Sequence, residues 1–305
     1  MTPDAAFNPV AGTPYRLAAN LEVVLAPNPS PMTYLGTNTF VLGDRTLAII
    51  DPGPDDPNHL RALIDAIGDR NVSHIFVTHS HLDHSPLARP LAQATGAQVY
   101  AFGDCKAGRS SVMQSLVTAG LTGGGEGIDH DFTPDCVLED GQDVAGDWGK
   151  LTTIHTPGHL GNHVCFQWDD AIFTGDHVMG WASSLVSPPD GDLTEFMASC
   201  AKLLTCDGRI YYPAHGAPVA QPAERLRWLI SHRRHREAQI LDALSQGAAT
   251  PQGITNTVYQ DTPAPLRPAA QRNVLAHLVD LHQRGKVSVQ GPLSQNAAFS
   301  RTGVA

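Results

Sequence analysis

The sequence lacks the features of a membrane or secreted protein. No apolar stretch approaches the roughly 20 residues that a membrane-spanning helix needs. The first thirty residues contain neither a basic segment nor an uninterrupted apolar core of the kind found in secretory signals. From these two absences we predict a soluble, cytoplasmic protein with no membrane partner.

Cysteine is scarce, and its spacing does not suit a structural zinc site. The five cysteines are Cys105, Cys136, Cys165, Cys200 and Cys206. Because their number is odd and no pair has zinc-site spacing, we expect reduced thiols in a reducing compartment. Cys165 lies between Val164 and Phe166 in an apparent strand, so core packing is its expected role. No cysteine falls inside a motif, which argues against a catalytic thiol.

Aromatic residues make up only 6% of the chain, whereas 28 glycines and 23 prolines provide many turns. Its 305 residues, 42% of them hydrophobic, suffice for one large α/β domain and a smaller unit. Basic residues are few in the first part: residues 1–221 contain 10 Lys and Arg against 25 Asp and Glu. Residues 222–305 contain 10 against 5. This shift predicts a domain boundary near Gln221-Pro222.

A run of metal-binding side chains follows an apolar segment. Residues 75–78 are predicted to form a short buried strand, and it is followed by His79, His81, Asp83 and His84. Alternate residues of an extended chain point the same way, which places His79 beside His81, whereas the other pair belongs to the turn. Three imidazoles and a carboxylate within six residues predict ligands for two neighbouring zinc-like cations.

Four further polar side chains also follow short apolar strands. They are Asp51, His159, Asp176 and His215. The ends of a sheet, with their Gly and Pro turns, give side chains the rigid support that a fixed ligand geometry requires. These residues therefore extend the predicted metal site.

This ordered set resembles the metallo-β-lactamase superfamily over residues 20 to 220, with the signature His-x-His-x-Asp-His at 79–84. The resemblance implies a four-layer αββα sandwich, with the metal ions at one edge of its two sheets. It also implies two metal ions held by seven residues. The first ion would be bound by His79, His81 and His159, the second by Asp83, His84 and His215, and Asp176 would bridge both.

Other residues near these positions have less defined roles. The resemblance implies that Asp51 supports the ligands without binding metal. We expect His163 to contact the ligands or the substrate. Either His163 or a metal-bound water is expected to donate a proton to the leaving group. The role of His177 stays open between function and packing. The loop at 187–192 is either a wall of the substrate cleft or a sharp connection before a helix at 193–204.

The C-terminal part predicts three helices and a β wing. The helices are expected at 223–245, 250–259 and 269–283 and a strand at 287–289, with frayed residues at the end of the chain. Residues 222–305 are thus predicted to form a linker helix and a small winged-helix domain, attached to a catalytic domain at 1–221. This arrangement resembles the β-lactamase-like protein 2 branch of the superfamily, which includes single-stranded RNA endonucleases.

Two roles are open for the winged helix. It either binds nucleic acid or is a packing module that covers the sandwich or contributes to a homodimer. The helix at 269–283 carries only Arg272 against Asp280, too few basic residues for reading base edges. The basic cluster of Arg233, Arg234 and Arg236 is alternatively expected to bind a phosphate or an acidic cofactor tail.

The ligand types predict direct hydrolysis by two metal ions. Dications about 3.5–4 Å apart share a water and lower its pKa towards 7, so that it attacks an ester, thioester or phosphorus centre. Asp83 and Asp176 are catalytic through the metals they hold, and the sequence offers no Gly-x-Ser-x-Gly nucleophile. Zinc suits these ligands, although iron and manganese accept the same set. The chain is predicted to be a dinuclear zinc hydrolase of a small ester, thioester or phosphoester.

Several alternatives follow from the resemblance. An RNA endonuclease is less favoured because the acidic main domain repels a polyanion unless the basic C-terminal part compensates. A mononuclear iron dioxygenase keeps the same motif and leaves part of it unused. Glyoxalase-II-like thioester hydrolysis fits all seven ligands but is paired with a different C-terminal domain. True β-lactamases and diiron nitric-oxide reductases depart from these ligands. Lactonases place a tyrosine over the site, a role not assigned to Tyr211 or Tyr212. A non-catalytic nucleic-acid-binding scaffold is expected to lose ligands, and this chain retains them.

Overall fold

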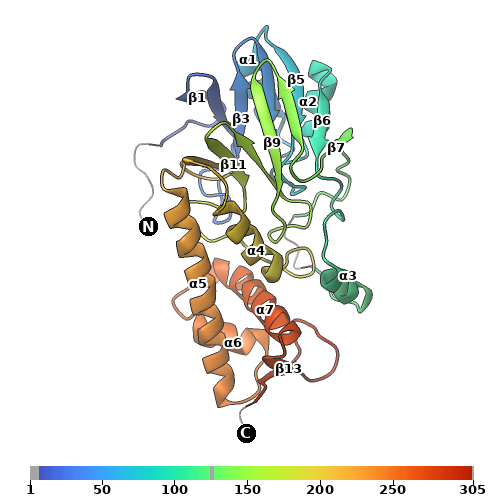
Figure 1. Cartoon of the computed structure of the whole chain (residues 1–305), viewed down its shortest axis with the longest axis vertical. Coiled ribbons are helices and arrows are strands. Elements are labelled where there is room, and N and C mark those ends of the chain that lie inside the picture. Colours follow the sequence, from blue (N-terminus) through green and yellow to red (C-terminus); the bar gives the residue numbers. More distant parts are fainter. Residues whose placement is uncertain (1–6, 124–126, 304–305) are drawn as a thin grey trace.

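The computed structural model describes residues 7–123 and 127–303 and contains two large sheets (Figure 1). The first sheet has seven strands that lie in chain order, and its last four strands run parallel to one another. Its strands are β1 (Pro14–Ala18), β2 (Leu21–Leu25), β3 (Asn38–Gly43), β4 (Thr46–Ile50), β5 (Asn71–Phe76), β6 (Gln98–Ala101) and β7 (Cys136–Val137). Since parallel strands end at the same edge, the residues after β4 and β5 lie close together.

The second sheet has five strands in the order β12-β11-β10-β9-β8. They are β8 (Asp143–Gly146), β9 (Gly149–His155), β10 (Val164–Trp168), β11 (Ala171–Gly175) and β12 (Ile210–Pro213). Aromatic side chains fill the space between the two sheets, where Phe40 meets Phe173 at 5.0 Å between ring centroids and Phe76 meets Phe166 at 5.2 Å. These buried rings hold the sheets face to face.

Helices cover the outer faces of both sheets and complete the predicted αββα sandwich. On the first sheet these are α1 (Pro57–Ile67) and α2 (Ala88–Thr95), which bury Leu63 and Leu91 against it. On the second sheet α4 (Leu193–Leu203) buries Phe196 against Ile154 and Ile172. A further helix, α3 (Ser111–Thr118), inserts Met113 into the core of the C-terminal unit.

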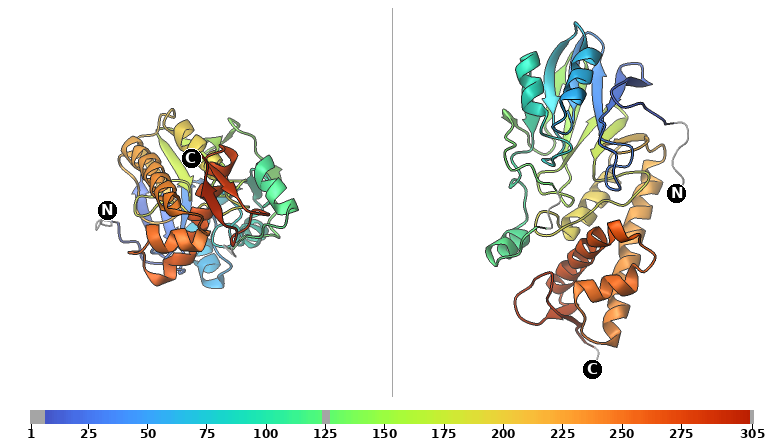
Figure 2. Two further views of the ribbon diagram at one scale, coloured as in Figure 1. Left: turned by 90° about the horizontal axis from the view of Figure 1, so that it is seen from below. Right: turned by 180° about the vertical axis from the view of Figure 1, so that it is seen from behind.

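The C-terminal unit has the predicted winged-helix architecture and forms one end of the molecule (Figure 2). Its elements are α5 (Pro222–Ala243), η1 (Leu244–Gln246), α6 (Pro251–Val258), η2 (Ala264–Leu266), α7 (Arg267–Gln283), β13 (Val287–Val289) and β14 (Phe299–Arg301). The first helix ends earlier than predicted, because the chain tightens into a 3-10 turn after Ala243. Among the described residues, no helix is both long and apolar enough to cross a membrane.

One prediction about this unit is wrong. The end of the chain is not frayed as far as it is described, because β14 pairs with β13 and Phe299 is fully buried. Binding of a phosphate or an acidic cofactor tail by the basic cluster stays a prediction, and the Arg233 side chain of that cluster is only 2% exposed. The boundary at Gln221-Pro222 stays a prediction, because α5 places Leu226 in the core beside α4 and Ile240 in the C-terminal core.

Candidate metal centre

The loops after four strands bring all seven predicted ligands together at one edge of the sandwich. After β5 come His79, His81, Asp83 and His84; His159 follows β9, Asp176 follows β11 and His215 follows β12. They form two groups of side chains, each with one donor atom per residue within 4.8 Å of the others. One group contains His79, His81, His159 and Asp176, and the other contains Asp83, His84 and His215.

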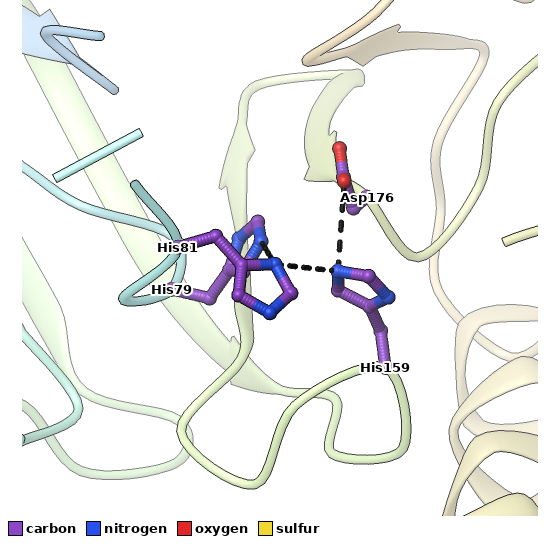
Figure 3. A group of neighbouring side chains, drawn as sticks. All are labelled: His79, His81, His159 and Asp176. Atoms are coloured by element: carbon purple, nitrogen blue, oxygen red, sulfur yellow. Dashed lines mark hydrogen bonds and ion pairs between the residues drawn. The ribbon is translucent and has the colours of Figure 1, made fainter. Parts of the chain in front are cut away.

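In the first group, donor atoms from three loops converge (Figure 3). His81 Nδ1 lies 2.9 Å from His79 Nε2 and 3.1 Å from His159 Nε2. His159 Nε2 is 3.5 Å from Asp176 Oδ2. Nitrogens at a bond length of 2.0–2.1 Å from one tetrahedral ion lie about 3.3 Å apart, so this spacing suits a zinc-sized ion.

Asp176 presents its other oxygen to the second group. Its Oδ1 lies 3.2 Å from His215 Nε2 and 3.7 Å from His84 Nε2. Asp83 Oδ2 is 3.2 Å from His215 Nε2 and 3.4 Å from His84 Nε2. The two carboxylate oxygens of Asp176 therefore face different groups, the geometry that a residue shared by two ions needs.

The outward-facing ring nitrogens of four histidines bind fixed partners. Two donate to backbone carbonyls: His159 Nδ1 to Leu185 O at 2.7 Å, and His215 Nδ1 to Gly36 O at 3.1 Å. His84 Nδ1 donates to Asp51 Oδ2 at 3.0 Å. His79 Nδ1 is 3.0 Å from the Thr78 hydroxyl. Where Nδ1 donates, the neutral ring directs the lone pair of Nε2 at the centre, as a metal ligand requires.

Asp51 supports this arrangement from behind the ligands. Its Oδ1 accepts the Thr78 backbone N–H at 2.7 Å, and its Oδ2 accepts the Thr78 hydroxyl at 2.7 Å as well as His84 Nδ1. The residue is buried and has a positive φ of 51°. A backbone in this uncommon region places the carboxylate across the ends of β4 and β5. Asp51 thus positions the His84 ring and also Thr78, where the ligand-bearing loop after β5 begins.

The charges at the centre suit a cation. Burial and the nearby His159 together lower the pKa of His81 to about 3. Burial also lowers the pKa of His159, so these two rings are neutral donors. Burial by itself raises the pKa of Asp176, but His215 and His84 outweigh it and hold that pKa well below its usual range. At the other group, the carboxylates of Asp83 and Asp176 outweigh burial and raise the pKa of His215 to about 10 and the pKa of His84 well above its ordinary value, so a bound cation would displace the protons on these two rings.

Unpartnered polar atoms give an independent reason to place ions here. Among the described residues, His84 Nε2 and Asp176 Oδ1 are buried without a hydrogen-bond partner. Such atoms are costly to bury unless something binds them. Both atoms point into the second group, where a dication would supply the missing interaction. The donor set and these atoms fit divalent metal ions.

His163 lies behind Asp176, which differs from its predicted proton-donor role. Its Nε2 accepts the Asp176 backbone N–H at 3.2 Å, and its Nδ1 lies 2.9 Å from the Thr156 hydroxyl. The side chain is fully buried, and burial holds its pKa well below the ordinary value. A ring that uses both nitrogens away from the cleft has no free proton for a leaving group. It positions the backbone of Asp176.

His177 and the loop after it are structural. The His177 ring is fully buried 4.4 Å from the Phe196 ring, with its Nε2 3.4 Å from Cys200 Sγ. In the loop at 187–192, Asp190 pairs with Arg109 at 2.8 Å. The loop therefore braces the neighbouring segments and leads directly into α4, the second of its two predicted alternatives.

A cavity of about 790 Å³ extends from the metal ligands to the C-terminal unit. Its mainly apolar walls come from both parts of the molecule and include Met32, Trp181, Leu185, Tyr259, Leu266 and Pro268. Trp181 stacks on Tyr34 at 5.0 Å and donates from Nε1 to His215 O at 3.2 Å. Tyr211 and Tyr212 do not line it: Tyr211 donates to Leu203 O, and Tyr212 packs between the sheets.

The sequence did not reveal these walls or the residues that hold the loop after Asp176. On α5, Arg225 donates to Met179 O and Ala182 O at 2.6 Å each. Arg233, eight residues later on the same helical face, donates to Ser184 O. The sequence did contain a signal for this role: the two arginines recur on the helix face that carries Leu226 and Leu229. An arginine on an apolar helix face is expected to be buried. The basic run around it concealed the pattern.

Comparison with known proteins extends these observations. A model of the metallo-beta-lactamase superfamily matches residues 32–215, and a model of the beta-lactamase associated winged helix domain matches residues 250–292. The beta-lactamase-like protein 2 homolog of Drosophila melanogaster is 31% identical over 90% of this chain and 91% of its own length. An atrochrysone carboxyl ACP thioesterase of Aspergillus fumigatus is 30% identical over 81% and 76%, respectively.

Solved structures support the same fold. A beta-lactamase domain protein from Burkholderia ambifaria has a TM-score of 0.79 and 20% identity, covering 98% of this chain and 96% of its own. A metallo-beta-lactamase family protein from Thermus thermophilus has a TM-score of 0.75 and 22% identity, covering 94% and 100%. At these identities the likeness concerns the fold, including the C-terminal unit.

Proposed function

This chain belongs to the metallo-beta-lactamase superfamily and carries its associated winged helix domain, and from that premise we propose a dinuclear zinc hydrolase of acyl esters or thioesters. The observation that carries the proposal is Asp176, whose two oxygens face two separate groups of donors. Zinc is the proposed metal because most of the donors are imidazole nitrogens. Asp83, with His84 and His215, would hold the second ion.

The chemistry divides between the ions and the chain. Bound dications would supply a water of lowered pKa and polarise a substrate carbonyl. The chain's own residues fix the positions of the donors. Asp176 sets the spacing of the two groups, and His163 Nε2 holds the Asp176 backbone by accepting its N–H. Asp51 orients His84 through Nδ1. These contacts pre-organise the site, so that little rearrangement is needed during reaction.

The cavity favours an acyl substrate over a nucleic acid. Among the described residues that line it there is no Lys and one arginine, Arg272, which donates to Ser187 Oγ at 2.8 Å and to Pro188 O. A polyanion needs several cations along its path, whereas apolar walls bind an acyl chain through its buried area. The name of the Aspergillus fumigatus relative includes a thioesterase activity, which agrees with this substrate class. RNA cleavage is therefore not the proposed activity.

Elemental analysis combined with two substrates tests the proposal. We expect two zinc ions per chain and hydrolysis of a medium-chain acyl thioester, with little turnover of bis-p-nitrophenyl phosphate. Two zinc ions with rapid phosphodiester cleavage and no thioesterase activity would overturn the substrate class. One iron per chain without either activity would overturn the dinuclear hydrolase and favour the dioxygenase alternative.

A further inference from the structure

The segment Ser184–Val186 lies between the metal centre and the C-terminal helices. On the metal side, Leu185 O accepts the Nδ1 proton of His159 at 2.7 Å. The Ser184 hydroxyl donates to Asp176 O and to His177 O, the latter at 2.9 Å. One short segment thus binds a side chain from the first group and the backbone of the residue shared by both groups.

On its other side, the same segment binds two residues of the C-terminal unit. Val186 N donates to Asn273 Oδ1 at 3.1 Å, and this residue belongs to α7. Arg233 on α5 donates to Ser184 O and, through Nη1, to the same Asn273 oxygen at 2.8 Å. The Arg233 side chain is 2% exposed and lies over the Phe196 ring at 5.1 Å. Asn273 and Arg233 therefore bind the segment jointly.

These contacts fix the segment because they are buried. Removing Arg233 leaves Ser184 O without this donor, and removing the Asn273 oxygen leaves both Val186 N–H and the guanidinium short of an acceptor. Ser184 and Val186 are fully buried, so water does not readily replace the lost partners. The segment would shift to find new ones, and the carbonyl that orients the His159 ring would move with it.

We propose that Arg233 and Asn273 are positioning residues for the metal centre, acting through Ser184–Val186 on His159 and Asp176. The C-terminal unit is then part of the metal-binding apparatus in addition to being a wall of the cavity. This inference rests on the proposed function, since it presumes that the two donor groups bind metal. It concerns affinity for the ions, a property that can be measured without any substrate.

Three variants test this role by zinc competition with a chromophoric chelator. Loss of partners outside the ligand sphere typically weakens metal binding by 10–100-fold, and we expect about tenfold weaker binding in Arg233→Met and Asn273→Ala. Asn273→Asp keeps the oxygen that accepts from Val186 N and Arg233, so it should retain wild-type affinity. Rescue by Asp distinguishes positioning from general packing, because it restores the acceptor alone.

Arg284→Ala is the matched control. Arg284 follows α7 and donates to Glu237 on α5 and to Asp280 on α7, at 2.6 Å each. Among the described residues, it makes no hydrogen bond to Ser184–Val186. We expect unchanged zinc affinity in this variant. If circular dichroism shows that Arg233→Met does not fold, the comparison of Asn273→Ala with Asn273→Asp tests the proposal by itself. Equal zinc affinities in these two variants would overturn it. Wild-type zinc affinity in all folded variants would overturn the positioning role and leave the proposed function intact. A wild-type chain that binds no metal would overturn both.

Discussion

At the residue level, three histidines of the proposed metal centre have two contacts with different tasks. In His84, His159 and His215 one ring nitrogen faces the proposed ions, and the other binds a carboxylate or a carbonyl. The first task depends on residue type, which the sequence displays directly. The second depends on which backbone carbonyl or carboxylate happens to lie nearby, and that is decided by the packing of distant segments.

Removal of one second-group ligand tests the two-ion arrangement. We expect Asp83→Ala to lose one of two metal ions and to reduce turnover by orders of magnitude, because its oxygen faces both His84 and His215. His215→Ala should have the same effect. Metal content per chain and initial rates measure it, with exposed Asp65→Ala on α1 as control. Full activity in either ligand variant would exclude a two-metal mechanism.

Asp51 allows a test of support from outside the ligand set. Asp51→Asn keeps the shape but has one acceptor oxygen where Thr78 and His84 need two. We expect about 10–100-fold weaker metal binding or activity, with the fold retained. Titration with a competing chelator measures the change. Affinity equal to that of the wild type would show that Asp51 is needed only for folding.

The ligand types could be predicted from the sequence, and so could Asp51 as a support through the family resemblance, whereas the backbone supports could not. His79, His81, Asp83 and His84 lie in one short run, and each of the three later ligands follows a recognisable strand. Local sequence patterns were therefore sufficient to predict the ligand types. Gly36 and Leu185 contribute only backbone carbonyls, and a carbonyl has no residue-type signal. His163 carried a signal, but its meaning depended on whether the ring faced the cleft or the core.

At the level of elements, helices and strands followed apolar periodicity, and the errors arose where a long helix serves two cores. Arg225 and Arg233 on α5 lie among its buried side chains, although the surrounding run is basic. The charge of this run therefore gave no sign that Arg233 is buried. The carbonyls that these arginines bind lie 43 to 49 residues away along the chain, which no local pattern reveals.

The wing strand β14 provides a prediction about an element that was expected to be frayed. Phe299 is fully buried in the C-terminal core with Ile254, Leu278 and Val287. We expect Phe299→Ala to destabilise this unit by about 3–5 kcal/mol, through lost burial and the cavity left behind. Thermal unfolding followed by circular dichroism measures the effect, and exposed Arg301→Ala on the same strand is the control. Equal unfolding temperatures for both variants would contradict the packing of this strand.

At the level of the whole molecule, both units contribute walls to the cavity. Leu266 belongs to the C-terminal unit and lines the cavity together with Met32 and Trp181. We expect Leu266→Asp to raise KM for a medium-chain acyl thioester roughly tenfold, from lost apolar contact and a buried charge, while an acetyl thioester is hydrolysed as before. Ala264→Asp, two residues earlier and exposed, is the matched control. An equal effect on both substrates would argue against an acyl-binding wall.

The metal centre also joins the two sheets, and this gives a prediction about stability. His79, His81 and His84 follow a strand of the first sheet, whereas His159 and His215 follow strands of the second. Ions that bind the folded chain alone stabilise it by roughly 4 kcal/mol at a thousand times their dissociation constant. We therefore expect a strong chelator to lower the unfolding temperature and added zinc to restore it. Asp83→Ala should show a smaller shift, because it retains only the first group of donors. A chelator-independent unfolding temperature in the wild type would mean that the sheets are held together by their aromatic core alone.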